Sequence, residues 1–180
     1  MSKKNLIDQI EKLNKELSAS GFNIFSYSHF IEDYFTRLLD GQGLPSSDHA
    51  DCLLQDGTRI EIKYSSLVVH HGYRLAHQYP YFKWAKIRGQ NNSKDGYVDY
   101  ILLIGYIDYE KHYDQLTQLQ TILHKAQSHH WWFWYLPYAA VMQEVGRRNQ
   151  IEKSLFGKSW IDSFFLGYDL EHLARVLTTK

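Results

Sequence analysis

Between residues 58 and 65, apolar and polar side chains alternate strictly along the chain. Ile60 and Ile62 fall on one side, whereas Glu61 and Lys63 fall on the other. A repeat of two residues is typical of a strand that buries one of its faces. The pattern therefore predicts a β-strand over residues 58–65 whose apolar side chains enter the core.

An Asp-Gly pair that ends at Gly57 predicts a turn before this strand. A two-residue loop would place Asp51 opposite Ile62, on the apolar face and away from Glu61. A three-residue loop over residues 55–57, with Gly57 left-handed in a bulge, places Asp51 opposite Glu61 instead. Only this second register also gathers the apolar residues of both strands on one face. We therefore expect Asp51 and Glu61 to be neighbours.

Periodicity also predicts the elements around this hairpin. Helices are expected over residues 5–18, 28–40, 108–127 and 169–177, and further strands over 98–107 and 131–136. The segment 67–97 is expected to be an insertion with little regular structure. This order of elements predicts an α/β fold with a mixed central sheet flanked by helices, and with extra helices at both ends.

The chain has 180 residues, of which 44% are hydrophobic, so it is long and apolar enough for one domain with a substantial core. We expect a single domain over residues 1–180, with its core over 28–136 and a helical extension over 137–180. Twenty basic and twenty acidic residues cancel. A neutral chain lacks the basic excess that is common in nucleic-acid-binding proteins, although a local basic groove is sufficient for binding.

A single cysteine, Cys52, excludes an internal disulfide and suits a reducing cytoplasm. We expect Cys52 to pack on the apolar face of the hairpin. The N-terminal segment leads into an amphipathic helix rather than an apolar signal segment, and no apolar run is long enough to cross a membrane. The sequence therefore predicts a cytoplasmic protein without a membrane partner.

The pairing of Asp51 with Glu61 has chemical consequences. Their Cβ atoms should lie about 5 Å apart, and two ionised carboxylates so close repel unless a cation lies between them. A hard, oxygen-seeking ion such as Mg²⁺ resolves this conflict and can activate water for attack on a phosphodiester. Lys63 shares their face and can orient that water. Asp48 is an alternative first carboxylate, but it precedes the strand and fits the register less well.

Two basic clusters are candidates for contact with DNA. Cations alternate with aromatic side chains in the first cluster, which suits phosphate contact and base stacking, although a solvated surface segment has the same pattern. The second cluster is equally explained as a solvated helix end. The candidate DNA-binding residues are Lys83, Lys86, Arg88 and Lys94 in the first cluster and Arg147 and Arg148 in the second. The adjacent pairs among the ten histidines lack the spacing of a zinc site.

The order of elements, with Asp51 before the turn and Glu61-x-Lys63 after it, resembles the PD-(D/E)XK nuclease superfamily, which has a restriction-endonuclease-like αβββαβ core. The resemblance covers residues 28–136. The residue before the first aspartate is Ala50 rather than proline, a departure that the superfamily often tolerates.

The resemblance also implies roles for individual residues. Asp51 and Glu61 would be metal ligands, with the backbone carbonyl of Ile62 as a possible third, and Lys63 would hold the attacking hydroxide. The family often places a glutamate on the helix before the hairpin, and Glu32 is the match. Glu32 is equally explained as a solvated helix charge.

A compact chain of this kind looks like a type II restriction endonuclease. The resemblance then implies a Mg²⁺-dependent, sequence-specific enzyme that hydrolyses phosphodiester bonds in double-stranded DNA as a homodimer or higher homo-oligomer. Three alternatives remain open: a homing or repair endonuclease with the same core, a nuclease that acts on RNA or branched DNA, and a non-catalytic DNA-binding or assembly module that kept the fold.

Overall fold

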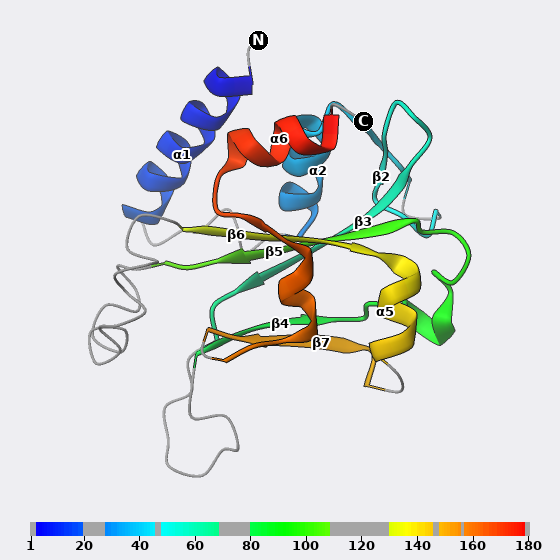
Figure 1. Cartoon of the computed structure of the whole chain (residues 1–180). Coiled ribbons are helices and arrows are strands. Elements are labelled where there is room, and N and C mark those ends of the chain that lie inside the picture. The colour runs from blue at the N-terminus through cyan, green and yellow to red at the C-terminus, as the bar shows by residue number, and fades with distance from the viewer. Residues whose placement is uncertain are drawn as a thin grey trace.

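A mixed six-stranded sheet lies at the centre of the molecule (Figure 1). This computed structural model describes residues 3–19, 28–45, 48–68, 80–108, 130–145, 148–155 and 157–178. In spatial order the strands are β1 (Gln42–Gly43), β2 (Cys52–Leu53), β3 (Arg59–Ser66), β5 (Tyr100–Tyr106), β6 (Trp131–Pro137) and β8 (Phe165–Gly167). β3 and β5 run parallel, and every other neighbouring pair is antiparallel. The expected α/β class with a mixed central sheet is confirmed.

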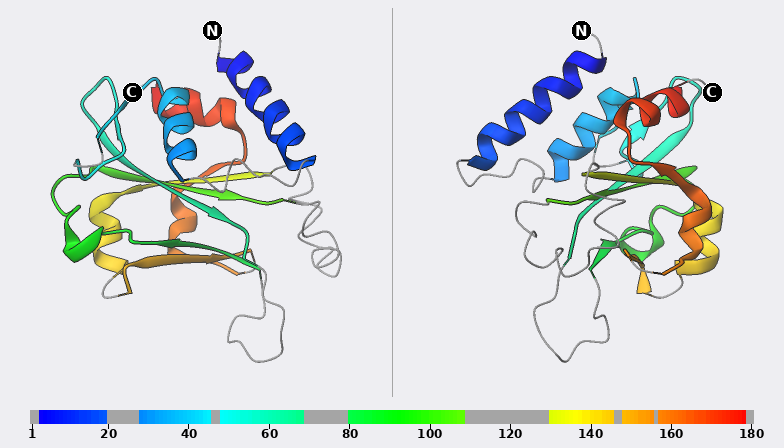
Figure 2. Two further views of the ribbon diagram at one scale, coloured as in Figure 1. Left: turned by 180° about the vertical axis from the view of Figure 1, so that it is seen from behind. Right: turned by 60° about the vertical axis from the view of Figure 1, so that its left-hand side comes forward.

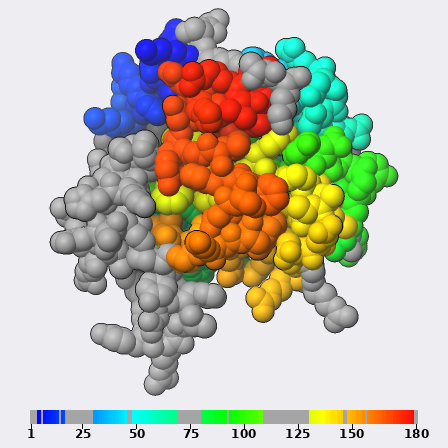
Figure 3. Space-filling view, in the orientation of Figure 1, coloured from blue at the N-terminus to red at the C-terminus, as the bar shows by residue number. Residues whose placement is uncertain are grey.

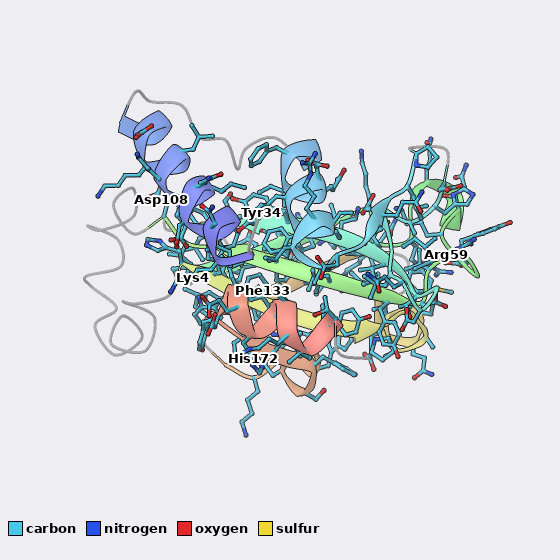
Figure 4. The ribbon with its side chains drawn as sticks, turned by 90° about the horizontal axis from the view of Figure 1, so that it is seen from above. Lys4, Tyr34, Arg59, Asp108, Phe133 and His172 are labelled. Atoms are coloured by element: carbon cyan, nitrogen blue, oxygen red, sulfur yellow. The ribbon has the colours of Figure 1, made fainter. Side chains whose placement is uncertain are left out.

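Three helices cover one face of this sheet, as the two views of Figure 2 show. They are α1 (Lys3–Ala19), α2 (Ser28–Leu38) and α6 (Leu170–Thr178). The apolar stripe of α2 contributes Phe35 and Leu38, neither of which is exposed, and they join Ile60 and Ile62 of β3 in one core cluster. The alternation of β3 therefore aims its isoleucines at the helices, as expected. Tyr34 and Phe133, labelled in Figure 4, belong to the same cluster.

A second, smaller layer covers the opposite face. It consists of β4 (Tyr81–Ala85) paired antiparallel with β7 (Gln150–Ser154), of α5 (Tyr138–Val145) and of a 3₁₀ helix over Trp160–Phe164. Another 3₁₀ turn, Gln90–Asn92, follows β4. Because Gly105 has no side chain, the ring of Phe82 packs directly on β5; a Cβ there would lie 2.7 Å from the Phe82 Cζ atom. In Figure 3, α6 and the segment before it cover much of one face of the molecule.

Most of the expected elements are present within two residues of their expected ends. Two expectations are wrong. The segment 67–97 contains strand β4, and the segment after residue 137 contains strands β7 and β8 besides its helices. β4 was missed because its alternating pattern is only five residues long and its partner β7 lies far along the chain. The helix expected over 108–127 lies outside the described residues, apart from Asp108.

The second helix ends slightly earlier than expected. Asp40 adopts the left-handed conformation, with φ of 52°, and the Gly41 N–H donates to the Thr36 carbonyl at 2.9 Å. Across the part of the chain that the structure describes, no helix combines the length and the apolar character that a membrane span requires.

Candidate functional site

The hairpin that carries the candidate motif has the three-residue loop. The N–H of Leu54 donates to the Thr58 carbonyl at 2.9 Å, and Gly57 between them has a φ of 87°. Cys52 pairs with Ile60 in the antiparallel ladder that follows. Asp51 stands one residue beyond this last pair of the ladder. The predicted register is thus confirmed.

Asp51 stands just before β2, at the point where the chain bends toward β3. Its backbone N–H donates to the Ile60 carbonyl at 3.0 Å. Its carboxylate Oδ2 accepts a hydrogen bond from the Ile62 N–H at 2.8 Å. The side chain therefore lies along the edge of β3 that β2 leaves open. Since the N–H and C=O of one residue in a strand point to the same edge, the Ile62 carbonyl faces this side as well.

Ile60 and Ile62 project from one face of β3, and Glu61 projects from the other face, toward the layer of β4 and β7. The residue is completely buried. Its Oε1 atom forms an ion pair with Lys63, two positions along the same face, and its Oε2 atom forms an ion pair with Lys94. A buried carboxylate is retained only when its charge is compensated, and here two ammonium groups do so.

The charges of this cluster shift its pKa values. Burial raises the pKa of the Glu61 carboxyl; the Asp51 charge adds to this rise, while Lys63 and Lys94 oppose it. For Lys63, burial acts to lower the pKa of the ammonium group, but the charges of Glu61 and Asp51 outweigh it, and the pKa is raised. Lys63 is therefore fully protonated at neutral pH.

An acidic pocket of about 380 Å³ opens beside Asp51. Its charged lining residues are Glu32 and Asp33 from α2, Asp48, Asp51 and Lys94. Glu32 thus lies on the helix before the hairpin and lines the same pocket as Asp51. Glu61 and Lys63 are not part of the lining. A pocket with four carboxylates and one ammonium group favours cations.

A smaller pocket of about 260 Å³ adjoins the first and shares part of its wall. His49, Arg59 and Tyr97 line it, and the rings of His49 and Tyr97 lie 4.6 Å apart. Half of the Tyr97 residue, 51%, is exposed. Figure 4 shows Arg59 at one end of the sheet, far from Asp108 at the other. The two pockets share Leu44, Asp48 and Ala50 in their walls, and together they are called the hollow below, with an acidic part and a part that holds Arg59 and Tyr97.

The first predicted DNA-binding cluster is dispersed in the structure. Lys83 and Lys86 are exposed, and the Lys83 Nζ lies 3.8 Å from a Glu152 oxygen. The guanidinium of Arg88 is engaged with the Asp95 carboxylate. Lys94 instead forms an ion pair with the buried carboxylate of Glu61.

Of the second cluster, Arg148 is exposed, and Arg147 lies outside the described residues. Sequence reasoning also missed the anchors around the site. The Tyr138 hydroxyl donates to Asp95 at 2.8 Å, and the Ser65 hydroxyl accepts the backbone N–H of Lys83 at 2.9 Å. No local pattern signals these contacts, because their partners come from separate elements.

In the described ranges, no three Asp, Glu, His or Cys side chains are gathered closely enough to hold a metal ion by themselves. The oxygen donors that could hold a metal ion here are the carboxylates of Asp51 and Glu61 and the backbone carbonyl of Ile62, two side chains and one main-chain atom. These are hard oxygen donors of the kind that Mg²⁺ prefers, and Mg²⁺ commonly retains several waters in such sites.

Searches with protein-family models and against curated proteins find no match for this chain.

Proposed function

We propose that this chain is a Mg²⁺-dependent DNA endonuclease of the restriction-endonuclease-like fold, most like a type II restriction enzyme. The observation that carries this proposal is the pairing of a buried Glu61 with Lys63 on one face of β3, with the Asp51 carboxylate held at the same point of the hairpin. Two carboxylates and a lysine in this arrangement suit phosphodiester hydrolysis with a divalent ion.

Asp51, Glu61 and the Ile62 carbonyl are the groups that would hold the ion. The chemistry that Mg²⁺ supplies when bound is polarisation of a phosphoryl oxygen and a lowered pKa of a bound water. Lys63 is protonated at neutral pH, so it donates hydrogen bonds instead of accepting a proton. It orients the attacking water and offsets the negative charge that grows on the phosphate.

The hollow beside the site supports a nucleic-acid substrate. Arg59 offers a cation for a phosphate, and Tyr97 offers an exposed ring on which a base can stack. The acidic part of the hollow repels phosphates until a divalent ion offsets its charge, so DNA binding should depend on the metal. Replacing Tyr97 with Ala should weaken DNA binding in Ca²⁺ about fivefold or more without changing metal affinity. Unchanged DNA affinity would remove Tyr97 from the DNA contact surface.

The direct test is incubation of the purified protein with plasmid and phage DNA in Mg²⁺. We expect discrete fragments that disappear in EDTA and in the Glu61→Gln and Lys63→Met variants, with a rate loss of at least about 100-fold. Glu171→Gln on α6, an exposed carboxylate that does not line either pocket, is the control and should cleave at the wild-type rate. Cleavage by Glu61→Gln at that same rate contradicts the proposal.

A non-catalytic DNA-binding or assembly module is the second candidate. The observation that favours it is that both lysines are already paired with Glu61, which leaves a compensated ion cluster of the kind that can be purely structural. This candidate predicts DNA or partner binding that Asp51→Ala leaves intact, with no cleavage in any divalent metal.

A panel of intact, damaged, branched and RNA substrates separates restriction from repair, homing and RNA-directed activities.

A further inference from the structure

Lys94 approaches the candidate site from outside the motif. It follows the 3₁₀ turn Gln90–Asn92, in the connection from β4 to β5, and 31 positions separate it from Lys63. Its ammonium group forms an ion pair with the Oε2 atom of Glu61, and its side chain is only 16% exposed. Lys63 occupies the other oxygen of the same carboxylate. Both oxygens of Glu61 thus have a lysine partner.

The connection that carries Lys94 is held in place on both sides. The backbone N–H of Lys94 donates to the Arg88 carbonyl at 3.3 Å. The next residue, Asp95, binds the Arg88 guanidinium and accepts a hydrogen bond from the Tyr138 hydroxyl. The backbone is therefore fixed, and the long side chain of Lys94 is the part that can move.

Lys94 also separates Glu61 from the open pocket. It lines the acidic pocket together with Asp51, whereas Glu61 lies behind it and is completely buried. A cation that enters through the pocket meets the Lys94 ammonium group before it reaches the Glu61 oxygen. Lys94 and an incoming ion would compete for the same oxygen atom.

The charges favour an exchange of one cation for the other. Two carboxylates, Asp51 and Glu61, lie in a cluster with two ammonium groups, Lys63 and Lys94, both of which are ion-paired with Glu61, so the formal charges of the four groups cancel. A divalent ion at the two carboxylates adds two positive charges that repel both lysines. The proposed reaction requires Lys63 to stay on its face of β3. Lys94 lines a pocket whose other charged groups are all carboxylates, so its ammonium group can leave Glu61 and move toward one of them.

We propose that Lys94 is a displaceable counter-ion that closes the metal site: it neutralises Glu61 in the absence of metal and must release the Oε2 atom when a divalent ion binds. Lys94 is then a positioning residue rather than a catalytic one. This inference rests on the proposed metal-binding function of Asp51 and Glu61.

The first test measures divalent-ion affinity without DNA, by calorimetric titration of Mn²⁺ and Ca²⁺. Lys94→Met removes the competing charge while keeping the chain length, so the variant should bind the ion at least about fivefold more tightly than wild type. Lys94→Arg keeps the charge and should bind it with nearly wild-type affinity. Lys12→Met, which removes a lysine whose side chain is 78% exposed on α1, is the control for net charge.

The second test uses the unmodified protein and does not depend on how a variant folds. Amine acetylation followed by mass spectrometry should label Lys94 slowly without metal and at least about threefold faster in saturating Ca²⁺, because the released ammonium group enters the pocket. The labelling rate of Lys12 should not change with metal.

The outcomes distinguish this inference from the function on which it rests. Tighter ion binding by Lys94→Met with metal-dependent labelling of Lys94 supports it. If wild type binds the ion and cleaves DNA but Lys94→Met binds the ion equally or more weakly, the counter-ion role is wrong and the nuclease function stands. If neither wild type nor Lys94→Met binds any divalent ion, both are wrong.

Discussion

At the scale of single residues, Glu61 shows what the fold has to supply for this site. A carboxylate with no exposure to solvent would be strongly unfavourable alone, and the structure compensates it with Lys63 and Lys94. Alternation along the strand was enough to place Glu61 and Lys63 on one face. It contained no signal for Lys94, because that contact depends on how a connection between two distant strands folds back.

Cys52 offers a direct check on the apolar side of the hairpin. The residue is fully buried, and burial raises the pKa of its thiol to about 11. The thiol therefore stays protonated and enclosed at neutral pH, and only the thiolate reacts readily. We expect Cys52 in the native protein to remain unlabelled by a disulfide reagent such as DTNB at pH 8 and to react fully in denaturing urea. Rapid stoichiometric labelling of the native protein contradicts the predicted core position.

Asp95 allows a prediction on pH dependence away from the candidate metal ligands. The hydrogen bond from Arg88 holds the pKa of Asp95 below its ordinary value, helped by that from Tyr138 and opposed by burial. A carboxyl group with a lowered folded-state pKa stabilises the fold above its unfolded pKa, and this contribution is lost as pH falls through the folded value.

The stability difference between wild type and Asp95→Asn should therefore be constant from about pH 8 to pH 5 and shrink below about pH 4. Urea denaturation at a series of pH values measures this difference. If the stability difference between the two proteins instead grows as the pH falls, the lowered pKa of Asp95 does not stabilise the fold.

At the scale of elements, the register of the hairpin β2–β3 determines whether Asp51, Glu61 and Lys63 lie close enough to act together. Its register follows from the left-handed conformation of Gly57, which closes the three-residue loop. The sequence was sufficient for this prediction because an Asp-Gly turn, the burial pattern and the chemistry of the carboxylates all agreed on one register. β4 shows the opposite case, since its partner β7 could not be inferred from a local pattern.

Replacing Gly57 with Val should therefore affect stability and metal affinity together. A β-branched residue at a φ of 87° costs about 1–2 kcal/mol, although a Cβ at this position meets no atom within 4 Å. Gly157→Val is the matched control, because Gly157 has a similar φ of 85°, a Cβ there also meets nothing within 4 Å, and the residue lies outside the hairpin. Thermal unfolding and ion titration of both variants measure the effect: both should lose stability, and Gly57→Val alone should lose ion affinity. Equal losses of ion affinity in the two variants would show that the turn does not set the register.

At the scale of the whole molecule, neutral net charge and a nuclease function are compatible because the charges are arranged locally. Four of the twenty acidic residues line one pocket, and Arg59 and Tyr97 line the adjoining one. The overall α/β architecture could be predicted from periodicity alone. The second layer of β4, β7 and α5 could not, since it depends on pairing between segments that no local pattern connects.

A chain with one such site needs two copies to cut both strands of a duplex at once. We therefore expect a homodimer, and light scattering of the purified protein measures its mass directly. A monomer at every concentration that also cuts both strands together contradicts this expectation and points to sequential nicking.

The measurement that tests the central claim most directly is the initial rate of plasmid cleavage in Mg²⁺ by wild type and by Lys63→Met, at equal concentrations of folded protein. The loss of Lys63 leaves the buried Glu61 with Lys94 as its ion-pair partner and therefore costs stability as well as chemistry, which is why the two rates are compared at equal concentrations of folded protein. The account predicts discrete fragments from wild type and a rate at least about 100-fold lower from the variant. Equal rates from the two proteins, or no cleavage by wild type of any DNA substrate in Mg²⁺ or Mn²⁺, would contradict it.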